Sequence, residues 1–420
     1  MYEDHSSRRE RRVVVTGIGA ITPIGIGVDG LRAGLRSGRS AVRLVTDFDT
    51  SATETHIAAF VEDFDPLPYL EGKKVKRLDK FSKFAVAAAK MAVTDAGLDL
   101  SLEAEDRMGV CLGTALGGVG FAEEQYPRFL SHGPRGVNPM LALSVFNGAG
   151  SCNIAIELGL SGPVTANGDS CAAAPIAIGN AVEFIRAGQA DVMLSGGCEA
   201  PLSPLCFASY SIVGAMSRRN EDPAAASRPF DADRDGFVIA EGAAILVLEE
   251  YEHARNRRAR IYGEVLGHAS TYGANPSRDT GWDSLQMARC MRDCLRAGGV
   301  APRDVGYINA HAVGSRMGDA AEAEAIGQAF GDAARTAPVS STKGFHGHAL
   351  GASGAWYAAI CLLSLCDDWL PPTLNLVQAD SECELNHIGE PSGRETRAVT
   401  ALSNSFSAGG INACLLFGRV

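Results

Sequence analysis

Residues 162–176 read GPVTANGDSCAAAPI, and this order of residue types predicts a strand, a sharp turn and a helix. A short apolar run is followed by a polar turn, by Cys171, and by small residues that lead into the stretch 176–186. Pro175 is compatible with a first helical turn, which needs no hydrogen bond from its nitrogen. We therefore expect Cys171 at a helix N-terminus, where the helix dipole lowers the pKa of a thiol and favours the nucleophilic thiolate.

The alternative for Cys171 is a buried structural cysteine, which is the usual fate of an unpaired thiol. The chain contains 11 cysteines without regular spacing. This pattern indicates reduced thiols rather than a disulfide framework or a zinc site. Residues elsewhere in the chain must therefore decide whether Cys171 is a nucleophile.

The composition predicts a large globular protein. A chain of 420 residues, 46% of them hydrophobic, predicts two or three domains with an ample core. Residues 1–11 are polar and charged, and we expect a disordered leader there. No apolar run is expected to reach the length of a membrane span, so we expect a cytoplasmic protein without a membrane partner. The net charge of −11 argues against nucleic acid as a partner.

The second half of the chain repeats the pattern of the first. Residues 338–355 again give a strand, a polar turn and a small-residue helix, and residues 399–410 repeat the glycine-ended strand of residues 191–197. These two matches predict an α/β fold of two duplicated halves, 12–255 and 256–420. Polar loops are expected at the carboxyl ends of parallel strands, where α/β sites form.

Four side chains suited to acyl transfer follow predicted strands: Cys171, His311, Lys343 and His348. A duplicated α/β fold can bring them into one crevice. A cysteine with a positioned histidine forms a nucleophilic pair. A second histidine and a lysine supply donors for an oxyanion and a fixed positive charge. Each histidine alone is more often a structural hydrogen-bonding group, so the combination carries the prediction.

A basic cluster precedes the alanine-rich helix that we expect at residues 84–96. Its members are Lys73, Lys74, Lys76, Arg77, Lys80 and Lys83. A solvated helix entry explains such a cluster about as well as a docking surface for an acidic partner does. From the residues alone, both interpretations stay open.

Six motifs together resemble the β-ketoacyl synthases of fatty acid and polyketide assembly. They are RVVVTGIG at 12–19, GDSCAA at 168–173, SRPFDADRDGF at 227–237, and the stretches 311–319, 343–348 and 404–412, in the family's order. The resemblance implies a thiolase-like αβαβα architecture and usually a homodimer, with a heterodimer of related subunits as the alternative. It implies no metal and no free cofactor, because the substrate is carried on the phosphopantetheine arm of an acyl carrier protein.

The resemblance also implies a role for each matching position. Cys171 would carry the acyl chain, His311 and His348 would promote malonyl decarboxylation and hold the enolate oxygen, and Lys343 with Glu322 would fix the charges, supported by Asp319. The backbone amides of Cys171 and of the loop Phe406, Ser407, Ala408 and Gly409 would form the oxyanion hole. The family docks its acidic carrier on basic residues, which here would be Lys73, Lys74, Lys76 and Arg77.

The chain departs from the family's pattern at three places beside this site. Val313 removes one of two hydroxyls that would hold the pantetheine arm, whereas Ser315 keeps the other. Ala408 replaces a bulky gatekeeper by a methyl group, which leaves room for a branched or cyclic intermediate. His346 adds an imidazole near the crevice and is a candidate proton-transfer group.

Three functions are compatible with these residues. The leading hypothesis is a specialised ketosynthase that forms a carbon-carbon bond on a carrier-bound acyl chain with decarboxylation of an extender unit. The altered gatekeeper, Val313 and His346 motivate an alternative, a non-decarboxylative aldol or Claisen cyclisation with or without lactone release. A third reading is a silent subunit that sets chain length in a heterodimer, but Cys171 argues against it.

Overall fold

A 12-stranded mixed sheet runs through the computed structural model, which describes residues 11–273 and 282–420. Two half-sheets meet where Val14 and Val15 pair with Glu264 and Gly263. The first half-sheet has the order β1 (Val13–Thr22), β8 (Gly242–Glu250), β7 (Val192–Glu199), β5 (Met108–Gly113) and β6 (Val164–Asn167). The second has the order β9 (Gly263–Tyr272), β16 (Ile411–Gly418), β15 (Thr400–Phe406), β10 (Tyr307–Asn309) and β11 (Pro338–Ser340), extended by β13 (Asn386–His387).

The two half-sheets repeat one topology. In each, the second strand is antiparallel to both the first and the third, and the fourth and fifth run parallel to the third. The strands β6 and β11, which suggested the repeat in the sequence, occupy the same place in their half-sheets, and so do β7 and β15. The predicted duplicated α/β fold is therefore confirmed.

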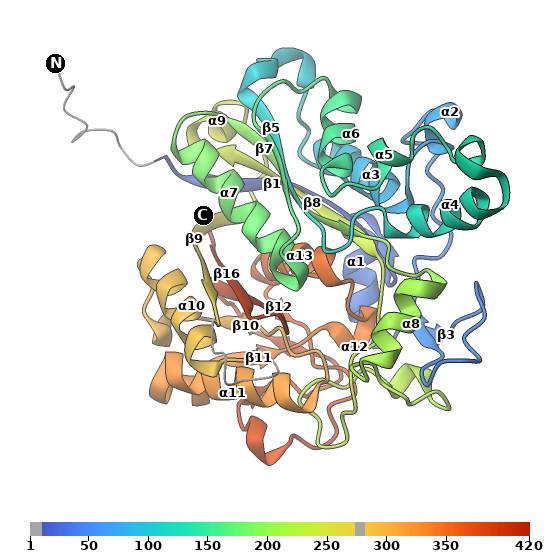
Figure 1. The fold of residues 1–420 in the computed structure, drawn as a ribbon. Helices are drawn as coiled ribbons and strands as arrows, with labels where there is room; N and C mark the ends of the chain where they lie inside the picture. Colours follow the sequence, from blue (N-terminus) through green and yellow to red (C-terminus); the bar gives the residue numbers. More distant parts are fainter. Residues whose placement is uncertain (1–10, 274–281) are drawn as a thin grey trace.

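Helices form three layers around the half-sheets (Figure 1). The middle layer consists of α7 (Ala173–Arg186) and α13 (Leu350–Asp367), which contact both half-sheets. The first half-sheet is covered by α3 (Lys80–Asp95) and α6 (Ala149–Leu158), and the second by α10 (Ser284–Ala297) and α11 (Arg316–Phe330). This is the αβαβα layering that the family resemblance implied.

One central helix contradicts an expectation from the sequence. By length and composition α13 could cross a membrane, whereas no apolar run of that length was expected. However, 89% of it is buried inside the protein. Packing against elements of both half-sheets explains why this helix is apolar on every side.

The outer helix α3 packs directly against β1. A Cβ atom at Gly17 would lie 2.2 Å from the Ala92 carbonyl oxygen, so only a glycine allows this approach. The helix begins at Lys80, four residues earlier than predicted, because Asp79 caps it by accepting the Phe81 N–H at 2.9 Å. Lys80 and Lys83 therefore belong to the helix and not to the segment before it.

The remaining described segments complete the fold. The expected leader falls mostly on residues 1–10, outside the described residues, but Arg11 is anchored by an ion pair with Asp191 and by donation to the Ile185 carbonyl at 2.8 Å. The other elements are β2 (Gly25–Ile26), α1 (Gly27–Arg36), β3 (Val42–Leu44), β4 (Ile57–Ala59), α2 (Gly72–Val75), α4 (Val119–His132), α5 (Leu141–Ser144), α8 (Pro204–Ile212), α9 (Tyr251–Asn256), α12 (Lys343–His346), β12 (Trp369–Leu370) and β14 (Arg394–Glu395).

Candidate active site

Cys171 lies in a single 3-10 turn, Ser170–Ala172, between the end of β6 and the start of α7. Ser170 has a φ of 54°, in the left-handed region that residues with a side chain rarely adopt. The chain therefore turns sharply just before the cysteine, as predicted. The α-helix itself begins at Ala173, so Cys171 lies in the 3-10 turn that precedes the regular helix.

Two histidines from the second half of the chain meet Cys171. The Cys171 Sγ lies 3.1 Å from Nε2 of His348. This sulfur and one ring nitrogen of each of His311 and His348 all lie within 4.8 Å of one another. The two rings are 5.4 Å apart and nearly perpendicular, at 84°. The structure thus brings together three of the four predicted catalytic residues, with Cys171 and His348 in direct contact.

Ser353 orients the His348 ring. Its Oγ accepts the Ala349 N–H at 2.8 Å and lies 3.0 Å from His348 Nδ1. We assign the Ser353 hydroxyl as the hydrogen-bond donor and His348 Nδ1 as the acceptor. The ring proton of the neutral histidine is then on Nε2, which faces the Cys171 sulfur. Sequence reasoning missed Ser353, because its contact depends on how α13 begins.

His311 presents an unpartnered nitrogen to the same space. It is 3% exposed, and its Nδ1 makes no hydrogen bond with any described residue. An unsatisfied buried nitrogen is costly unless a ligand completes it. Beside a nucleophile, such a group is suited to bind a substrate oxygen.

Burial sets the protonation of this cluster. Burial raises the pKa of the Cys171 thiol to about 11, while the Ser170 hydroxyl and the charge of Lys343 act in the opposite direction. The prediction of a lowered thiol pKa was therefore wrong, because desolvation outweighs the helix terminus. Burial and the nearby Lys343 charge also hold the pKa of His311 and of His348 well below the usual value, so both rings are neutral at pH 7.

Lys343 is present at the site, but its predicted partnership with Glu322 takes another form. The Lys343 ammonium donates to the His311 carbonyl oxygen. Glu322 accepts the N–H groups of His311 at 2.8 Å and Ala312 at 2.6 Å, and the Asn404 amide at 3.0 Å. Glu322 therefore holds the backbone of the histidine loop and acts on Lys343 only through longer-range attraction. Burial lowers the lysine pKa, and this attraction offsets only part of the lowering.

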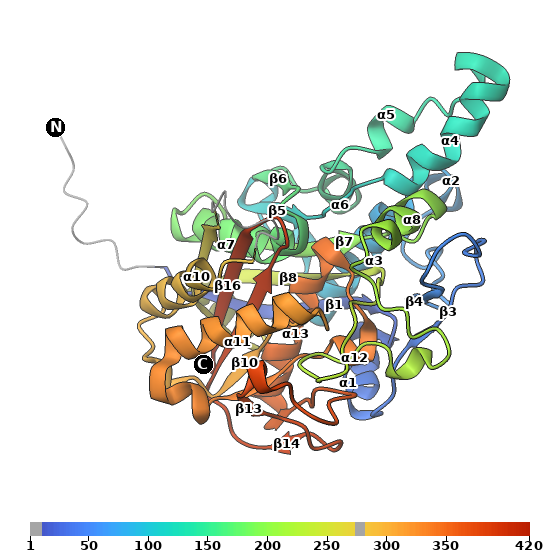
Figure 2. The same cartoon turned by 60° about the horizontal axis from the view of Figure 1, so that its bottom comes forward.

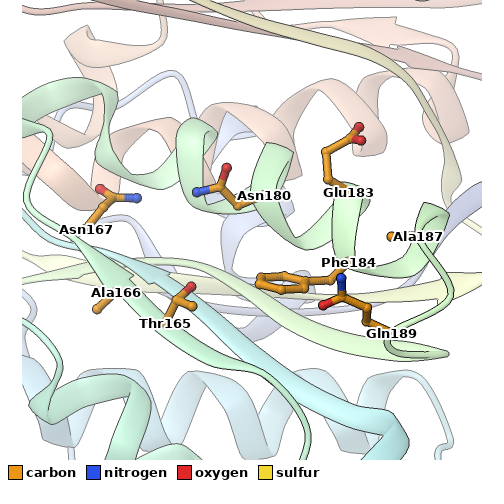
Figure 3. Close-up of a pocket in the computed structure, with 8 residues that line it drawn as sticks. All are labelled: Thr165, Ala166, Asn167, Asn180, Glu183, Phe184, Ala187 and Gln189. Carbon is orange, nitrogen blue, oxygen red and sulfur yellow. The ribbon is translucent and has the colours of Figure 1, made fainter.

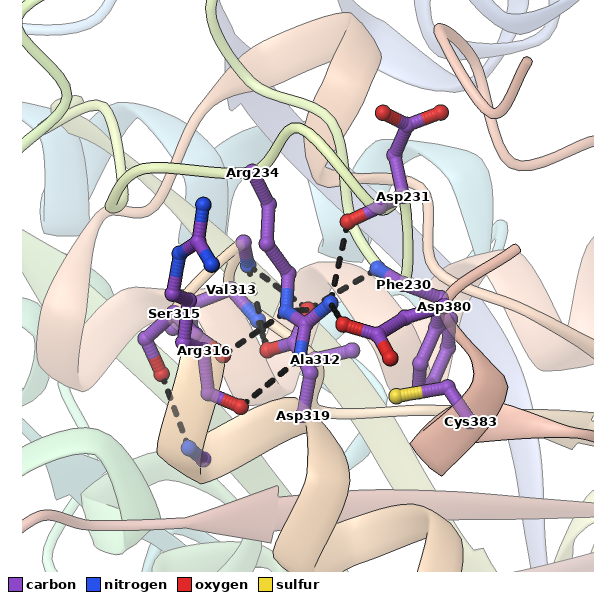
Figure 4. A network of polar contacts seen from close by, with 12 residues as sticks. Phe230, Asp231, Arg234, Ala312, Val313, Ser315, Arg316, Asp319, Asp380 and Cys383 are labelled. Atoms are coloured by element: carbon purple, nitrogen blue, oxygen red, sulfur yellow. Dashed lines mark hydrogen bonds and ion pairs between the residues drawn. The ribbon is translucent and has the colours of Figure 1, made fainter. Parts of the chain in front are cut away.

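Asp319 and Arg234 fix the continuation of that loop (Figure 4). Asp319 accepts the N–H groups of Val313 at 3.0 Å and Gly314 at 3.2 Å. Arg234, which is 1% exposed, donates to the Arg316 carbonyl at 2.8 Å and pairs with Asp380 at 2.6 Å. The segment that carries His311 is thus held by the two buried carboxylates of α11, Asp319 and Glu322, and by one buried guanidinium. Arg234 belongs to the motif at residues 227–237, but the sequence did not predict a role for it.

His346 does not take part in the reactive cluster. It is fully buried, its Nδ1 donates to the Gly347 carbonyl at 2.8 Å, and its Nε2 accepts from the Thr342 hydroxyl at 3.0 Å. Its ring contacts Trp356 and Tyr357. Both nitrogens are occupied by the protein, so the suggested proton-transfer role was wrong, and His346 is a packing residue of α12.

The loop after β15 offers one free amide beside the cysteine. The Ser407 N–H binds the Ile411 carbonyl, the Gly409 N–H binds the Ser407 hydroxyl, and the Gly410 N–H binds the Ser407 carbonyl. The Ala408 amide donates to no group in the described parts of the chain, and the Cys171 amide donates only to its own sulfur. These two N–H groups are therefore the candidates for the predicted oxyanion hole, while Phe406 is buried at 6.2 Å from the His311 ring.

The remaining predicted residues divide by exposure. Val313 is 5% exposed and packs among apolar side chains, whereas the Ser315 hydroxyl caps α11 by accepting the Gly318 N–H at 3.1 Å. Ser315 thus has a structural use besides any contact with a pantetheine arm. In the basic cluster, Lys74 pairs with Glu157, while Lys73, Lys76 and Arg77 are exposed and form no ion pair with a described residue.

Comparisons with known proteins agree with this geometry. The family profiles "Beta-ketoacyl synthase, N-terminal domain" and "Beta-ketoacyl synthase, C-terminal domain" match residues 10–254 and 262–377. The 3-oxoacyl-[acyl-carrier-protein] synthase 2 of Coxiella burnetii is 39% identical over 411 residues, which are 98% of this chain and 99% of that protein. A putative polyketide β-ketoacyl synthase 1 of Streptomyces cyaneus is 40% identical over 415 residues, 97% of each chain.

A solved structure extends the likeness to the whole fold. It is the ketosynthase of a type II polyketide synthase in complex with its acyl-carrier protein, and it superposes with a TM-score of 0.90 at 34% identity. The match covers 98% of this chain and 100% of that one. Together with the Cys-His-His cluster and the duplicated half-sheets, these matches show that the chain belongs to the β-ketoacyl synthase family, a family of acyltransferase enzymes.

Proposed function

We propose that this protein is a ketosynthase that takes an acyl chain from an acyl carrier protein onto Cys171 and extends it in fatty acid or polyketide synthesis. The observation that carries the proposal is the cluster of the Cys171 sulfur and two neutral imidazoles within 4.8 Å. The names of the relatives from Coxiella burnetii and Streptomyces cyaneus support both settings. The complex of a related ketosynthase with its carrier supports the choice of partner.

Two steps follow from this geometry. First, the Cys171 sulfur attacks the acyl thioester, the carbonyl-to-carrier bond breaks, and the thiol proton goes to the departing carrier sulfur. The amides of Cys171 and Ala408 would stabilise the oxyanion. Second, a carrier-bound malonyl group loses carbon dioxide, and its enolate carbon attacks the Cys171 thioester. The N–H groups of His311 and His348 would hold the enolate oxygen, and the cysteine thiolate leaves.

Intact-protein mass spectrometry with acyl thioesters tests the first step. We expect an acyl adduct on the protein that is absent in Cys171→Ala. Release of carbon dioxide from malonyl carrier protein tests the second step. If no acyl donor gives an adduct, the proposed enzyme is refuted.

A non-decarboxylative cyclisation is the second candidate. Ala408 is exposed and carries only a methyl group at the position of the family's bulky gatekeeper, which supports a bulky or folded intermediate. Acylation of Cys171 without release of carbon dioxide would favour this reaction over extension. A role as a silent chain-length subunit is disfavoured, because the nucleophile and both histidines are present.

The carrier would dock on the exposed residues Lys73, Lys76 and Arg77. Lys74 is a poor probe, because its pairing with Glu157 stabilises the protein itself. The double variant Lys73→Glu with Lys76→Glu should raise the KM for a carrier-bound substrate about tenfold and leave a small thioester unaffected. Arg303→Glu, an exposed charge reversal on the second half, is the control. An equal loss on both substrates would exclude docking at this place.

A homodimer would form along the edge of the first half-sheet. The edge strand β6 pairs only with β5, and its residues Val164, Thr165 and Ala166 are exposed. Exposed edge strands favour pairing with another chain. The elements β6, α6, α5 and α4 follow one border of the molecule (Figure 2), and Ile156 on α6 is 72% exposed.

A hollow of about 370 Å³ beside β6 and α7 is lined by none of the predicted site residues (Figure 3).

Sedimentation analysis tests the dimer. Ile156→Asp should shift the protein toward monomer, because it places a charge in the apolar interface. Leu102→Asp, at an exposed leucine outside this border, should leave the association state unchanged. A monomeric wild-type protein, or dimers of equal stability in both variants, would exclude this interface.

A further inference from the structure

Lys343 is a buried cation whose closest partners are not carboxylates. It is 1% exposed, and within the described residues it forms no ion pair. Its ammonium donates to the His311 carbonyl and lies 4.0 Å from the centre of the Tyr357 ring. Glu322 and Asp319 direct their oxygens to backbone N–H groups instead. One carbonyl and one aromatic face are therefore the direct contacts of this charge.

Tyr357 meets the Lys343 ammonium with the face of its ring. The residue is fully buried in α13, and its hydroxyl interacts with the Ser353 hydroxyl. The His346 ring stacks near it, with centres 6.2 Å apart and an interplanar angle of 29°. A desolvated ammonium over an aromatic face is strongly attracted to the ring quadrupole. The sequence does not predict this contact, because Lys343 and Tyr357 are 14 residues apart and belong to different helices, α12 and α13.

We propose that Tyr357 is a positioning residue that, through the face of its ring, keeps Lys343 charged and in place beside Cys171. The inference deepens the proposed function, since it concerns how that nucleophile is activated. Burial lowers the pKa of Lys343 and thus favours loss of its charge. The aromatic face opposes this loss. The Lys343 charge in turn lowers the pKa of the Cys171 thiol.

Several other charged or titratable groups face Lys343, and none replaces the ring at contact distance. Glu322 and Asp319 on α11 raise the lysine pKa from a distance, and so does Cys171. His311, His348 and His346 are neutral, because burial and the lysine charge hold their pKa values low. Removal of the ring should therefore shift the pKa values of Lys343 and Cys171 in opposite directions. Lys343 would lose its proton at a lower pH, and the thiol of Cys171 would ionise at a higher pH.

The rate of Cys171 alkylation by iodoacetamide, followed by peptide mass spectrometry from pH 6 to 12, tests this inference. Tyr357→Leu should slow alkylation at pH 7 about fivefold and move the midpoint of the profile to higher pH. Tyr357→Phe keeps the ring and should keep the wild-type midpoint. In a Lys343→Met background, Tyr357→Leu should cause no further shift. Equal shifts in the Phe and Leu variants, or an undiminished shift without the lysine, would overturn the proposal.

Fluorinated phenylalanines at position 357 keep the test valid if the leucine variant does not fold. Each added fluorine weakens the negative face of the ring while its shape is nearly preserved. We expect the alkylation midpoint to rise stepwise along the series. A constant midpoint would refute the role of the ring. Because iodoacetamide needs no carrier protein, failed acylation with normal alkylation would count against the proposed function and leave this inference intact.

Discussion

Glu322 shows at the residue scale how a buried carboxylate organises a site without touching the reacting atoms. Its oxygens accept the N–H groups of His311 and Ala312, and Asn404 donates to one of them. Glu322→Gln replaces one acceptor by an amide NH2 that faces a backbone donor. We expect the free energy of unfolding to fall by about 2–3 kcal/mol, because a buried donor loses its partner. Urea titration measures this loss.

Glu324→Gln is the matched control for this variant. Glu324 lies on the same helix, is exposed, and accepts only from Gln328. Its substitution should change the free energy of unfolding by less than about 0.5 kcal/mol. Equal urea midpoints for Glu322→Gln and Glu324→Gln would show that the loop does not depend on the buried carboxylate.

Residue types and motif order were sufficient to predict which groups carry the chemistry, but not how they contact one another. Cys171, His311 and His348 converge as expected, because they follow parallel strands of equivalent half-sheets. The direction of the thiol pKa was wrong, since burial depends on packing that the local sequence does not reveal. The roles of Ser353 and Tyr357 could not be predicted either, because only the packed position of α13 places them beside His348 and Lys343.

At the element scale, the position of the nucleophile depends on how closely β5 approaches the start of α7. A Cβ atom at Gly113 would lie 2.2 Å from the backbone carbon of Ala173, two residues after Cys171. Neither backbone can yield without displacing the 3-10 turn. Gly113→Ala should therefore destabilise the protein by about 2–3 kcal/mol and slow acylation of Cys171. Thermal unfolding and the acylation assay measure the two effects.

Gly327, in contrast to Gly113, has free space where a Cβ atom would be added. It lies exposed in α11, and a Cβ atom there would meet nothing within 4 Å. Gly327→Ala should raise the free energy of unfolding by about 0.5–1 kcal/mol, because alanine loses less conformational freedom in a helix. If both alanine variants changed stability alike, the close approach of β5 and α7 would not be the cause.

The repeat of strand, turn and small-residue helix made the element order predictable, whereas element boundaries were less so. The start of α3 was misplaced because the cap by Asp79 competes with the alanine-rich run as a start signal. The pairing of β1 with β9, which joins the half-sheets, has no signature in the sequence at all. Such a pairing forms between two complete half-sheets, so no local run of residues predicts it.

At the scale of the whole molecule, an ionic cluster ties the end of the first half-sheet to its surroundings. Glu249 on β8 binds Thr16 on β1, Arg257, and Nδ1 of His253 at 2.7 Å. The other ring nitrogen of His253 lies 2.9 Å from Glu103. Three segments distant in the sequence, at Thr16, at Glu103 and at residues 249–257, thus meet in one cluster directly before the chain crosses to β9.

This cluster should make the stability of the protein depend on pH. Hydrogen bonds to Glu249 and Glu103 raise the pKa of His253 from 6.5 to about 9, whereas the pKa of Glu249 is lowered to about 2. The carboxylate of Glu249 therefore stays ionised throughout the alkaline range. The stabilisation by protonated His253 is complete below about pH 6.5 and is lost as the pH rises through about 9.

The free energy of unfolding, measured by urea titration from pH 6 to 10, should fall more steeply in the wild type than in His253→Gln. The difference between the two proteins isolates the histidine from other groups that titrate in the same range. We expect that difference to shrink by about 2 kcal/mol across the interval, less than the full pKa change gives, because the ring is partly exposed. His132→Gln, an exposed histidine on α4, should keep the wild-type slope. Parallel curves for His253→Gln and the wild type would mean that the cluster is held by Arg257 alone.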